Sequence, residues 1–202
     1  MSEKPIIFST DMAKAILNSR KTVTRRLDGL NYINEDSWAW ECHGKSKEKD
    51  GVYFEFFSSI LGDGCNIKPR YQKGDILWVK ETWRNSAESK FKQITSNIMY
   101  KADMQPFEWC LYKWKSSMFM PKKIARIWLE VLDVRPERLQ EITETDSIRE
   151  GALKGYGRYA VNAYDFNYKD GFCKLWDSLN AKRGYPWESN PWVWRIEFTR
   201  KA

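Results

Sequence analysis

The spacing of hydrophobic positions predicts a strand, a helix and a second strand at the N-terminus. Residues 5–8, PIIF, form a short apolar run typical of a strand. The next segment has apolar residues at helical spacing, at Met12, Ala13, Ile16 and Leu17. Ser9 or Thr10 can cap this helix, because a hydroxyl oxygen accepts a hydrogen bond from the first turn. Residues 22–27, TVTRRL, follow with the β-branched alternation that is typical of a strand, so we expect a strand there.

Alternating patterns also predict strands in the centre and at the C-terminus. Residues 76–81 and 124–134 have the alternating side-chain pattern of a strand. A turn is expected after the second of these strands, around Pro136. In the last strand, Trp192 and Trp194 fall on one face because successive side chains of a strand point to opposite sides. We interpret that face as part of the core.

Two further helices are predicted in the C-terminal third. Thr143 can cap the first of them, and Gly151 is expected to end it. Residues 171–182, GFCKLWDSLNAK, form the second, with their apolar residues on one stripe.

The segment 28–73 is predicted to be irregular, apart from one strand-like piece at 51–57. Its polar run 42–50 and the polar residues 85–91 are expected to be loops. With no repeat, linker or low-complexity tract, the chain is expected to form one mixed α+β domain over residues 1–202, built on a barrel-like sheet.

The charge balance favours an anionic partner. Lys and Arg number 34 against 27 Asp and Glu, which gives a net charge of +7. Such a charge suits RNA or another nucleic acid, and the 11 tryptophans could stack on bases. For most of the tryptophans we favour the alternative that they fill the core.

The composition limits the chemistry that the protein can perform and predicts its cellular compartment. The cysteines are scattered without a CxxC pair and His43 is the single histidine, so we expect no metal and no cofactor. Acid–base work would fall to Lys, Glu, Asp or Tyr. No apolar run is long enough for a membrane span or a secretory signal, which predicts a cytoplasmic protein; the oligomeric state stays open.

In this order, the sequence blocks resemble the ASCH superfamily, and among its members the phage and prophage-encoded proteins. The blocks are KTVTRR, GDILWVKETW, MPKKIARIWLEV, LQEITETDSIREG, LWDSLNAKRG and NPWVWRIEF. The resemblance implies an α+β fold with a PUA-like mixed β-barrel, flanking helices and long loop insertions at about 28–70, 84–96 and 154–170.

The superfamily's corner motif, G-x-K-x-x-E-x-R, corresponds here to the stretch from Ser19 to Arg26. Ser19 replaces the glycine and Thr24 stands where many members have glutamate. Small bacterial ASCH enzymes that deacetylate 4-acetylcytidine are similar at this corner, with G-R-K-T-x-T-x-R. The likeness to them implies a catalytic set of Lys21, Thr24 and Glu150.

Such a set suits amide hydrolysis without a metal. A threonine hydroxyl is a weak nucleophile until a neighbour takes its proton, which a lysine can do if burial or nearby cations lower its pKa. Thr24 would attack the acyl carbonyl, and Glu150 would orient Lys21 or protonate the departing amine. Each residue also has a structural interpretation. Thr24 can simply be a β-former, Glu150 a surface carboxylate and Lys21 a solvated turn residue.

Other residues are candidates for contact with nucleic acid or substrate. Arginines can hold phosphates, and an aromatic plane on the predicted strand 76–81 could stack on a base. The segment 114–126 mixes aromatic and basic residues in a similar way. The candidates are Arg20, Arg25, Arg26, Trp78, Lys80, Glu81, Trp83, Lys123 and Arg126.

Two classes of function remain open. The first is a metal-free amidohydrolase acting on an N-acylated nucleobase or nucleoside. The second is a non-catalytic module that binds RNA, another nucleic acid or a modified nucleoside. An RNA-cleaving ASCH protein is a third possibility that nothing in the sequence selects.

Overall fold

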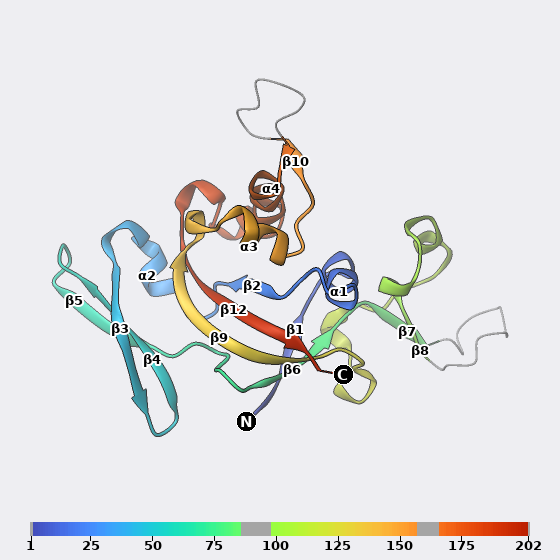
Figure 1. Cartoon of the computed structure of the whole chain (residues 1–202), viewed down its shortest axis with the longest axis horizontal. Helices are drawn as coiled ribbons and strands as arrows, with labels where there is room; N and C mark the ends of the chain where they lie inside the picture. The colour runs from blue at the N-terminus through green and yellow to red at the C-terminus, as the bar shows by residue number, and fades with distance from the viewer. Residues whose placement is uncertain (1, 86–97, 157–165, 202) are drawn as a thin grey trace. The chain divides into compact units, whose positions relative to one another are not determined.

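The computed structural model describes residues 2–85, 98–156 and 166–201, and the chain divides into two compact units (Figure 1). Unit 1 comprises Met1–Lys21, Gly74–Glu130 and Thr199–Ala202, and unit 2 comprises Thr22–Lys73 and Val131–Phe198. Each unit contains both helices and strands, so the predicted mixed α+β class is confirmed. The single domain and the barrel stay predictions.

Unit 1 combines strands with the helix α1. Its elements are β1 (Glu3–Ile7), α1 (Thr10–Leu17), β6 (Ile76–Lys80), β7 (Trp83–Asn85), β8 (Ile98–Tyr100) and the start of β9 (Trp128–Arg138). β1 runs parallel to β6 and β6 antiparallel to β9, with Leu77 opposite Leu129. Both leucines are fully buried and form part of the core.

Short helical turns connect β8 to β9 within unit 1. They are η3 (Lys101–Asp103), η4 (Pro106–Leu111), η5 (Ser117–Phe119) and η6 (Lys122–Ile124). This connection leaves several large apolar side chains exposed, at Phe107, Leu111, Met118 and Phe119.

In its described residues, unit 2 contains three α-helices, part of a five-stranded sheet and a separate three-stranded sheet. Its part of the first sheet has the order β9-β12-β2, with β2 at Val23–Arg26 and β12 at Trp192–Arg200. The second has the order β3-β4-β5, at Glu41–Glu48, Gly51–Ser58 and Asp63–Ile67. The remaining elements are α2 (Asn31–Glu35), α3 (Glu144–Arg149), α4 (Tyr168–Asn180), β10 (Gly155–Tyr156) and β11 (Phe166–Asn167), the last two forming a short antiparallel pair.

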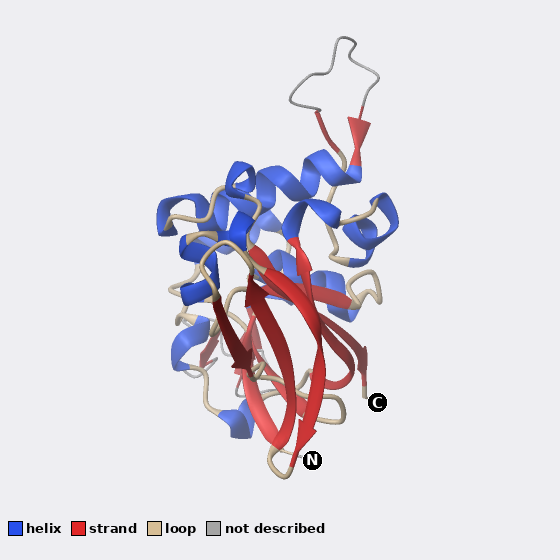
Figure 2. Ribbon diagram, turned by 90° about the vertical axis from the view of Figure 1, so that its left-hand side faces the viewer, coloured by secondary structure: helices blue, strands red, loops and turns tan. Residues whose placement is uncertain are grey.

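The first sheet of unit 2 has two distinct faces. Arg25 lies opposite Arg195 and Arg26 opposite Trp194, so strand alternation sends the two pairs to opposite sides. Helices α3 and α4 cover the side of Arg25, which we call the helix face (Figures 1 and 2). On the other side, the Trp194 ring packs against Phe54 of β4, with ring centres 5.3 Å apart. We call this side the β4 face.

The strand-like piece predicted at 51–57 is confirmed as β4. The prediction that the rest of 28–73 is irregular is wrong, because this segment also forms α2, β3 and β5. The run 42–50 was expected to be a loop, yet most of it belongs to β3 and its turn into β4. Its half-buried positions are Cys42, Gly44 and Ser46, alternating with exposed ones. Since these residues are small or polar, the strand period carries no hydrophobic signal.

The long strand was misplaced by four residues at each end. β9 spans Trp128–Arg138, Ile124 lies in η6, and no turn interrupts the strand at Pro136. Pro136 is tolerated because the pairing of β9 with β6 ends at Glu130, so one edge of the strand requires no backbone N–H there.

Several predicted elements are confirmed. Ser9 caps α1 by accepting from the Met12 amide at 3.3 Å, and Thr143 caps α3 by accepting from the Asp146 amide at 3.0 Å. β12 covers the predicted last strand, and Trp192 and Trp194 are both buried.

The predicted loop at 85–91 and much of the insertions predicted at 84–96 and 154–170 lie outside the described residues. No helix in the described parts of the chain is long and apolar enough to cross a membrane.

Candidate functional site

The corner motif begins in unit 1, directly after α1. Ser19 has a φ of 56°, in the left-handed region that favours glycine. The amides of Arg20 and Lys21 both donate to the Ala15 carbonyl, at 2.8 and 3.1 Å. Arg20 is exposed, whereas Lys21 is only 3% exposed and its ammonium lies 5.5 Å from the centre of the Phe8 ring.

Thr24 lies in β2 of unit 2, opposite Ile196 of β12. Its side chain belongs to the β4 face of the sheet, as does Arg26 two residues later. Thr24 is 4% exposed, and burial lowers the pKa of Arg26, although Tyr71 and Glu150 oppose this effect.

A narrow recess opens on the β4 face beside these residues. Arg26, Trp194 and Ile196 line it from the sheet. Its remaining lining residues are Asp28, Pro69, Arg70, Tyr71 and Val134.

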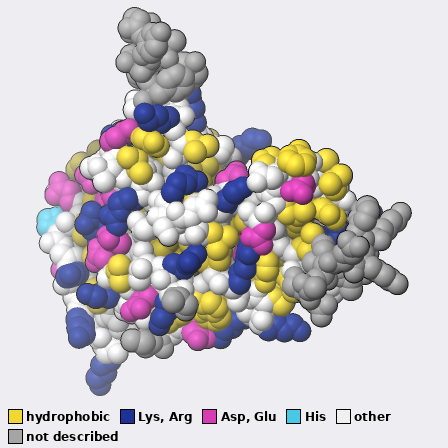
Figure 3. Space-filling model, turned by 45° about the vertical axis from the view of Figure 1, so that its right-hand side comes forward, with side chains coloured by type: hydrophobic (Ala, Val, Ile, Leu, Met, Phe, Trp, Pro, Cys, Tyr) yellow, Lys and Arg dark blue, Asp and Glu magenta, His cyan; other side chains and the backbone are white. Residues whose placement is uncertain are grey.

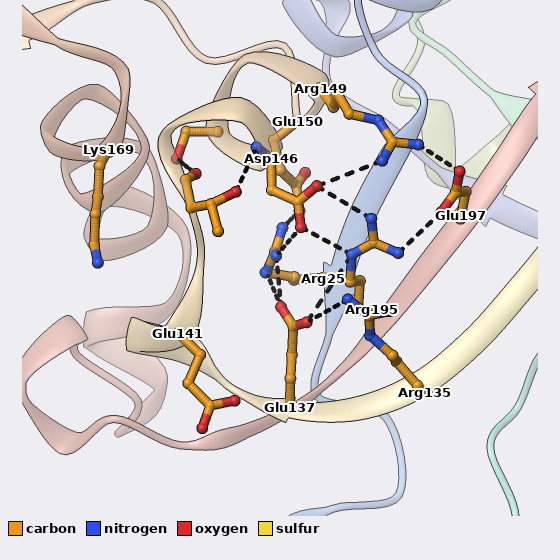
Figure 4. A network of polar contacts seen from close by, with 12 residues as sticks. Arg25, Arg135, Glu137, Glu141, Asp146, Arg149, Glu150, Lys169, Arg195 and Glu197 are labelled. Atoms are coloured by element: carbon orange, nitrogen blue, oxygen red, sulfur yellow. Dashed lines mark hydrogen bonds and ion pairs between the residues drawn. The ribbon is translucent and has the colours of Figure 1, made fainter.

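Arg25 points to the helix face and enters a network of charged side chains (Figure 4). Its guanidinium contacts Glu137 at 2.5 Å, Asp146 at 3.1 Å and Glu150 at 3.1 Å. The Arg25 side chain is 1% exposed, so these contacts compensate a charge that has left water. They give Arg25 a role in joining α3 and β9 to β2, and its predicted contact with a ligand stays a prediction.

Arg195 completes the network from β12. It binds Asp146 through two nitrogens, at 2.9 and 3.1 Å, and Glu197 at 3.0 Å. The hydrogen bonds from Arg195 hold the pKa of Asp146 at about 2, below its ordinary value of 3.8, and the charge of Arg25 acts in the same direction. Asp146 is therefore a carboxylate at neutral pH and serves as the shared anion of two arginines.

Glu150 caps the C-terminal end of α3 and is 3% exposed. The same end of α3 is attached to the start of β2, since the Thr22 amide donates to the Arg149 carbonyl at 2.8 Å. Glu150 reaches the network through Arg25. The Thr24 side chain belongs to the opposite face of the sheet from Arg25. The charge of Glu150 nevertheless also acts to raise the pKa of Arg26, which shares the face of Thr24.

Unit 1 brings two other predicted residues together. The guanidinium of Arg126 binds both carboxylate oxygens of Glu81, at 2.9 and 3.0 Å, and also Asp103 at 2.7 Å. Its central carbon lies 3.9 Å from the centre of the Tyr100 ring. Burial raises the pKa of Glu81, which is fully buried, although Arg126 opposes this shift.

The remaining candidates of unit 1 lie on its strands and turns. Lys80 donates to the Met118 carbonyl and lies 5.6 Å from the centre of a Trp78 ring. Trp83 in β7 has the ammonium of Lys115 at 5.1 Å. Both tryptophans are half-buried, and Lys123 is exposed in η6. Stacking of a base on either ring stays a prediction.

Most members of the charged network were not predicted from the sequence, namely Glu137, Asp146, Arg195 and Glu197. The partners of Arg25 are 112 to 125 residues away along the chain, so no local spacing connects them. One signal was present: Arg195 and Glu197 alternate with the hydrophobic residues of a buried strand, and charges there require partners.

Comparison with known proteins gives little further support. No family model and no curated protein matches the chain. The chain is similar to a solved structure described as the ASCH domain from Lactobacillus crispatus JV V101, with a TM-score of 0.42 and 12% sequence identity. The match covers 98% of this chain and 79% of that one. A likeness this weak does not establish the family or the function of the chain.

Proposed function

We propose that the chain is an ASCH-type protein with a PUA-like barrel, and that it hydrolyses the amide of an N-acylated nucleobase or nucleoside such as 4-acetylcytidine. The observation that carries this proposal is the burial of Lys21, Thr24 and Glu150, which are 3%, 4% and 3% exposed. Charged side chains are rarely buried without a specific reason, and buried ionisable groups concentrate at functional sites. Burial also favours a neutral lysine amine, which a general base requires.

The proposed reaction has two steps. The Thr24 hydroxyl oxygen attacks the acyl carbonyl carbon while the neutral amine of Lys21 takes the hydroxyl proton. The C–N bond then breaks, the exocyclic nitrogen of the base receives a proton and leaves as the free amine, and the acyl group stays on Thr24 as an ester. Water hydrolyses this ester, releasing the carboxylate and restoring the hydroxyl.

Glu150 has the role of a positioning carboxylate in this scheme. Its contact with Arg25, at 3.1 Å, holds its carboxyl group at the end of α3. From there we assign it the task of orienting Lys21.

The test is release of cytidine from 4-acetylcytidine by the purified full-length protein. Lys21→Ala and Thr24→Ala are each expected to lower kcat by about 100-fold or more, since general-base and nucleophilic groups contribute on this scale. Thr24→Ser should keep measurable activity because it retains the hydroxyl. Lys182→Ala, an exposed lysine of unit 2, is the matched control and should behave as the wild type.

Two results would count against the proposal. Wild-type protein without turnover above background would remove this substrate class. Turnover that survives both alanine substitutions would instead remove the assigned residues.

RNA binding is a second candidate function, and unit 1 favours it. Basic and hydrophobic side chains are interspersed on the face shown in Figure 3. In unit 1, Phe107 and Phe119 are 76% and 75% exposed, and the segment from Phe107 to β9 carries the exposed lysines Lys113, Lys122 and Lys123. Exposed rings among lysines are the elements with which proteins bind single strands. RNA affinity that falls steeply with rising salt is the supporting measurement.

A further inference from the structure

Phe8 lies at the junction between β1 and α1 and is fixed on both sides by regular structure. Its amide donates to the Lys80 carbonyl at 3.2 Å, which extends the parallel pairing of β1 with β6 by one residue. Ser9, the next residue, caps α1 through its hydroxyl oxygen. Phe8 is 3% exposed, so its ring lies inside unit 1.

The proposed general base lies over the face of this ring. The side-chain nitrogen of Lys21 is 5.5 Å from the centre of the Phe8 ring, and Lys21 is also only 3% exposed. The Ala15 carbonyl of α1 accepts from the Lys21 amide at 3.1 Å, which holds the backbone there. The negative face of an aromatic ring attracts a cation within about 6 Å of its centre, more strongly where water is excluded. Phe8 therefore shapes the electrostatic surroundings of Lys21.

The charge on Lys21 changes during the proposed reaction. Lys21 enters it as a neutral amine and becomes an ammonium when it takes the hydroxyl proton of Thr24. The face of a ring attracts an ammonium more strongly than a neutral amine, because the attraction acts on the charge. An interaction that strengthens as the transition state forms lowers the barrier without changing the binding of the substrate.

Resting on the proposed hydrolysis, we infer that Phe8 is a positioning residue of this reaction, whose ring stabilises the positive charge that develops on Lys21. In this role Phe8 acts through Lys21 and touches no substrate. A phenylalanine that only fills the core would be replaceable by any apolar side chain of similar size. The two roles differ in whether the electron density of the ring matters.

The experiment replaces Phe8 in the full-length protein by phenylalanines with one, two and three ring fluorines. Each fluorine withdraws electron density from the ring face, so the attraction for a cation weakens in steps while the shape of the ring hardly changes. With 4-acetylcytidine as substrate, we expect kcat to fall progressively along the series at constant KM, since the lost interaction is one made in the transition state. Phe8→Leu, which has no ring, should lose about tenfold in kcat, equivalent to about 1.4 kcal/mol.

Phe56 is the matched control. It is also a buried phenylalanine, 2% exposed, and its ring lies against Trp192 with the ring centres 5.2 Å apart. The same fluorinated residues at Phe56 should leave kcat at the wild-type value. Thermal unfolding of each variant checks that it is folded.

A second measurement does not depend on turnover. The ε-methylene groups of the lysines are observed by NMR in protein labelled with carbon-13 at that position, and the signal of Lys21 is the one that Lys21→Ala removes. A methylene above an aromatic ring is shielded by it. The protons of this group in Lys21 should therefore resonate upfield of those of the exposed lysines, and Phe8→Leu should move them back.

Each outcome bears on a different statement. In an active and folded protein, a kcat that stays constant or rises along the fluorinated series would overturn the inference and leave the hydrolysis intact. A Lys21 signal that Phe8→Leu does not move would overturn the contact itself. A wild type without turnover would refute the proposed reaction and, with it, the role of Phe8, whatever the NMR signal shows.

Discussion

The two units of the chain have opposite charge balances. Unit 1 has 16 of the 34 Lys and Arg residues and 8 of the 27 Asp and Glu residues, whereas unit 2 has 18 and 19. The whole net charge of +7 therefore belongs to unit 1, with an excess of eight, while unit 2 has one negative charge in excess. The overall charge describes neither unit.

The units also differ in where their charges lie. In unit 2, Arg25 and Arg195 are nearly inaccessible and are held by carboxylates from β9, α3 and β12. In unit 1, many lysines are exposed, and the Arg126 side chain is still 27% exposed where it meets Glu81. The two buried arginines of unit 2 therefore bind carboxylates of their own unit, whereas much of the positive charge of unit 1 faces solvent.

The largest effect on stability is expected from a substitution that breaks the charged network of unit 2. Arg25→Met leaves buried carboxylates with one arginine fewer, which we expect to lower the free energy of unfolding by about 3–5 kcal/mol. Arg126→Met in unit 1 should cost about 1–3 kcal/mol, because Glu81, whose pKa burial already raises, can take up a proton instead. Denaturant unfolding of both variants measures the difference.

Arg135→Met is the control for these variants, since its side chain is 53% exposed, and it should stay within about 0.5 kcal/mol of the wild type. Equal losses for Arg25→Met and Arg126→Met would show that the two units do not differ in this respect.

The second prediction concerns the stability of the protein at low pH. The pKa of Asp146 is about 2 in the folded chain against 3.8 ordinarily, so its contribution to stability is complete above pH 3.8 and is lost as the pH falls from there toward 2. With solvent screening, we expect about 1–2 kcal/mol. Unfolding measured between pH 5 and pH 2 should show a steeper loss for the wild type than for Asp146→Asn. Parallel curves for the two proteins would contradict the assignment.

The smallest effect is expected on the surface of unit 1. If RNA binds there, Lys123→Ala should reduce the slope of log affinity against log salt by about 1, because one phosphate contact disappears. Lys182→Ala in unit 2 should leave the slope unchanged. Binding measured by fluorescence anisotropy at several salt concentrations gives both slopes. Equal effects of the two substitutions would contradict the assignment of RNA binding to unit 1.

Local chemistry was enough to predict the helix caps and the regular strands. The hydroxyls of Ser9 and Thr143 each accept from an amide three residues later, a relation that the sequence itself displays. Trp192 and Trp194 are buried as predicted, although Val193 and Arg195 on the opposite face of the strand are buried as well. β3 escaped prediction because its half-buried positions are small or polar. β9 was predicted, but its end was placed too early because Pro136 was taken to end it.

The sequence by itself determined the mixed class of the fold, the caps and the corner that contains Lys21 and Thr24, since each depends on neighbours within a few residues. Only the tertiary structure decided that Arg25 and Arg26, adjacent in the chain, belong to different surroundings. One is held by carboxylates more than 100 residues away, and the other lines a recess with Arg70 and Tyr71. The physical reason is that a strand turns successive side chains to opposite faces, and what covers each face is decided by distant segments.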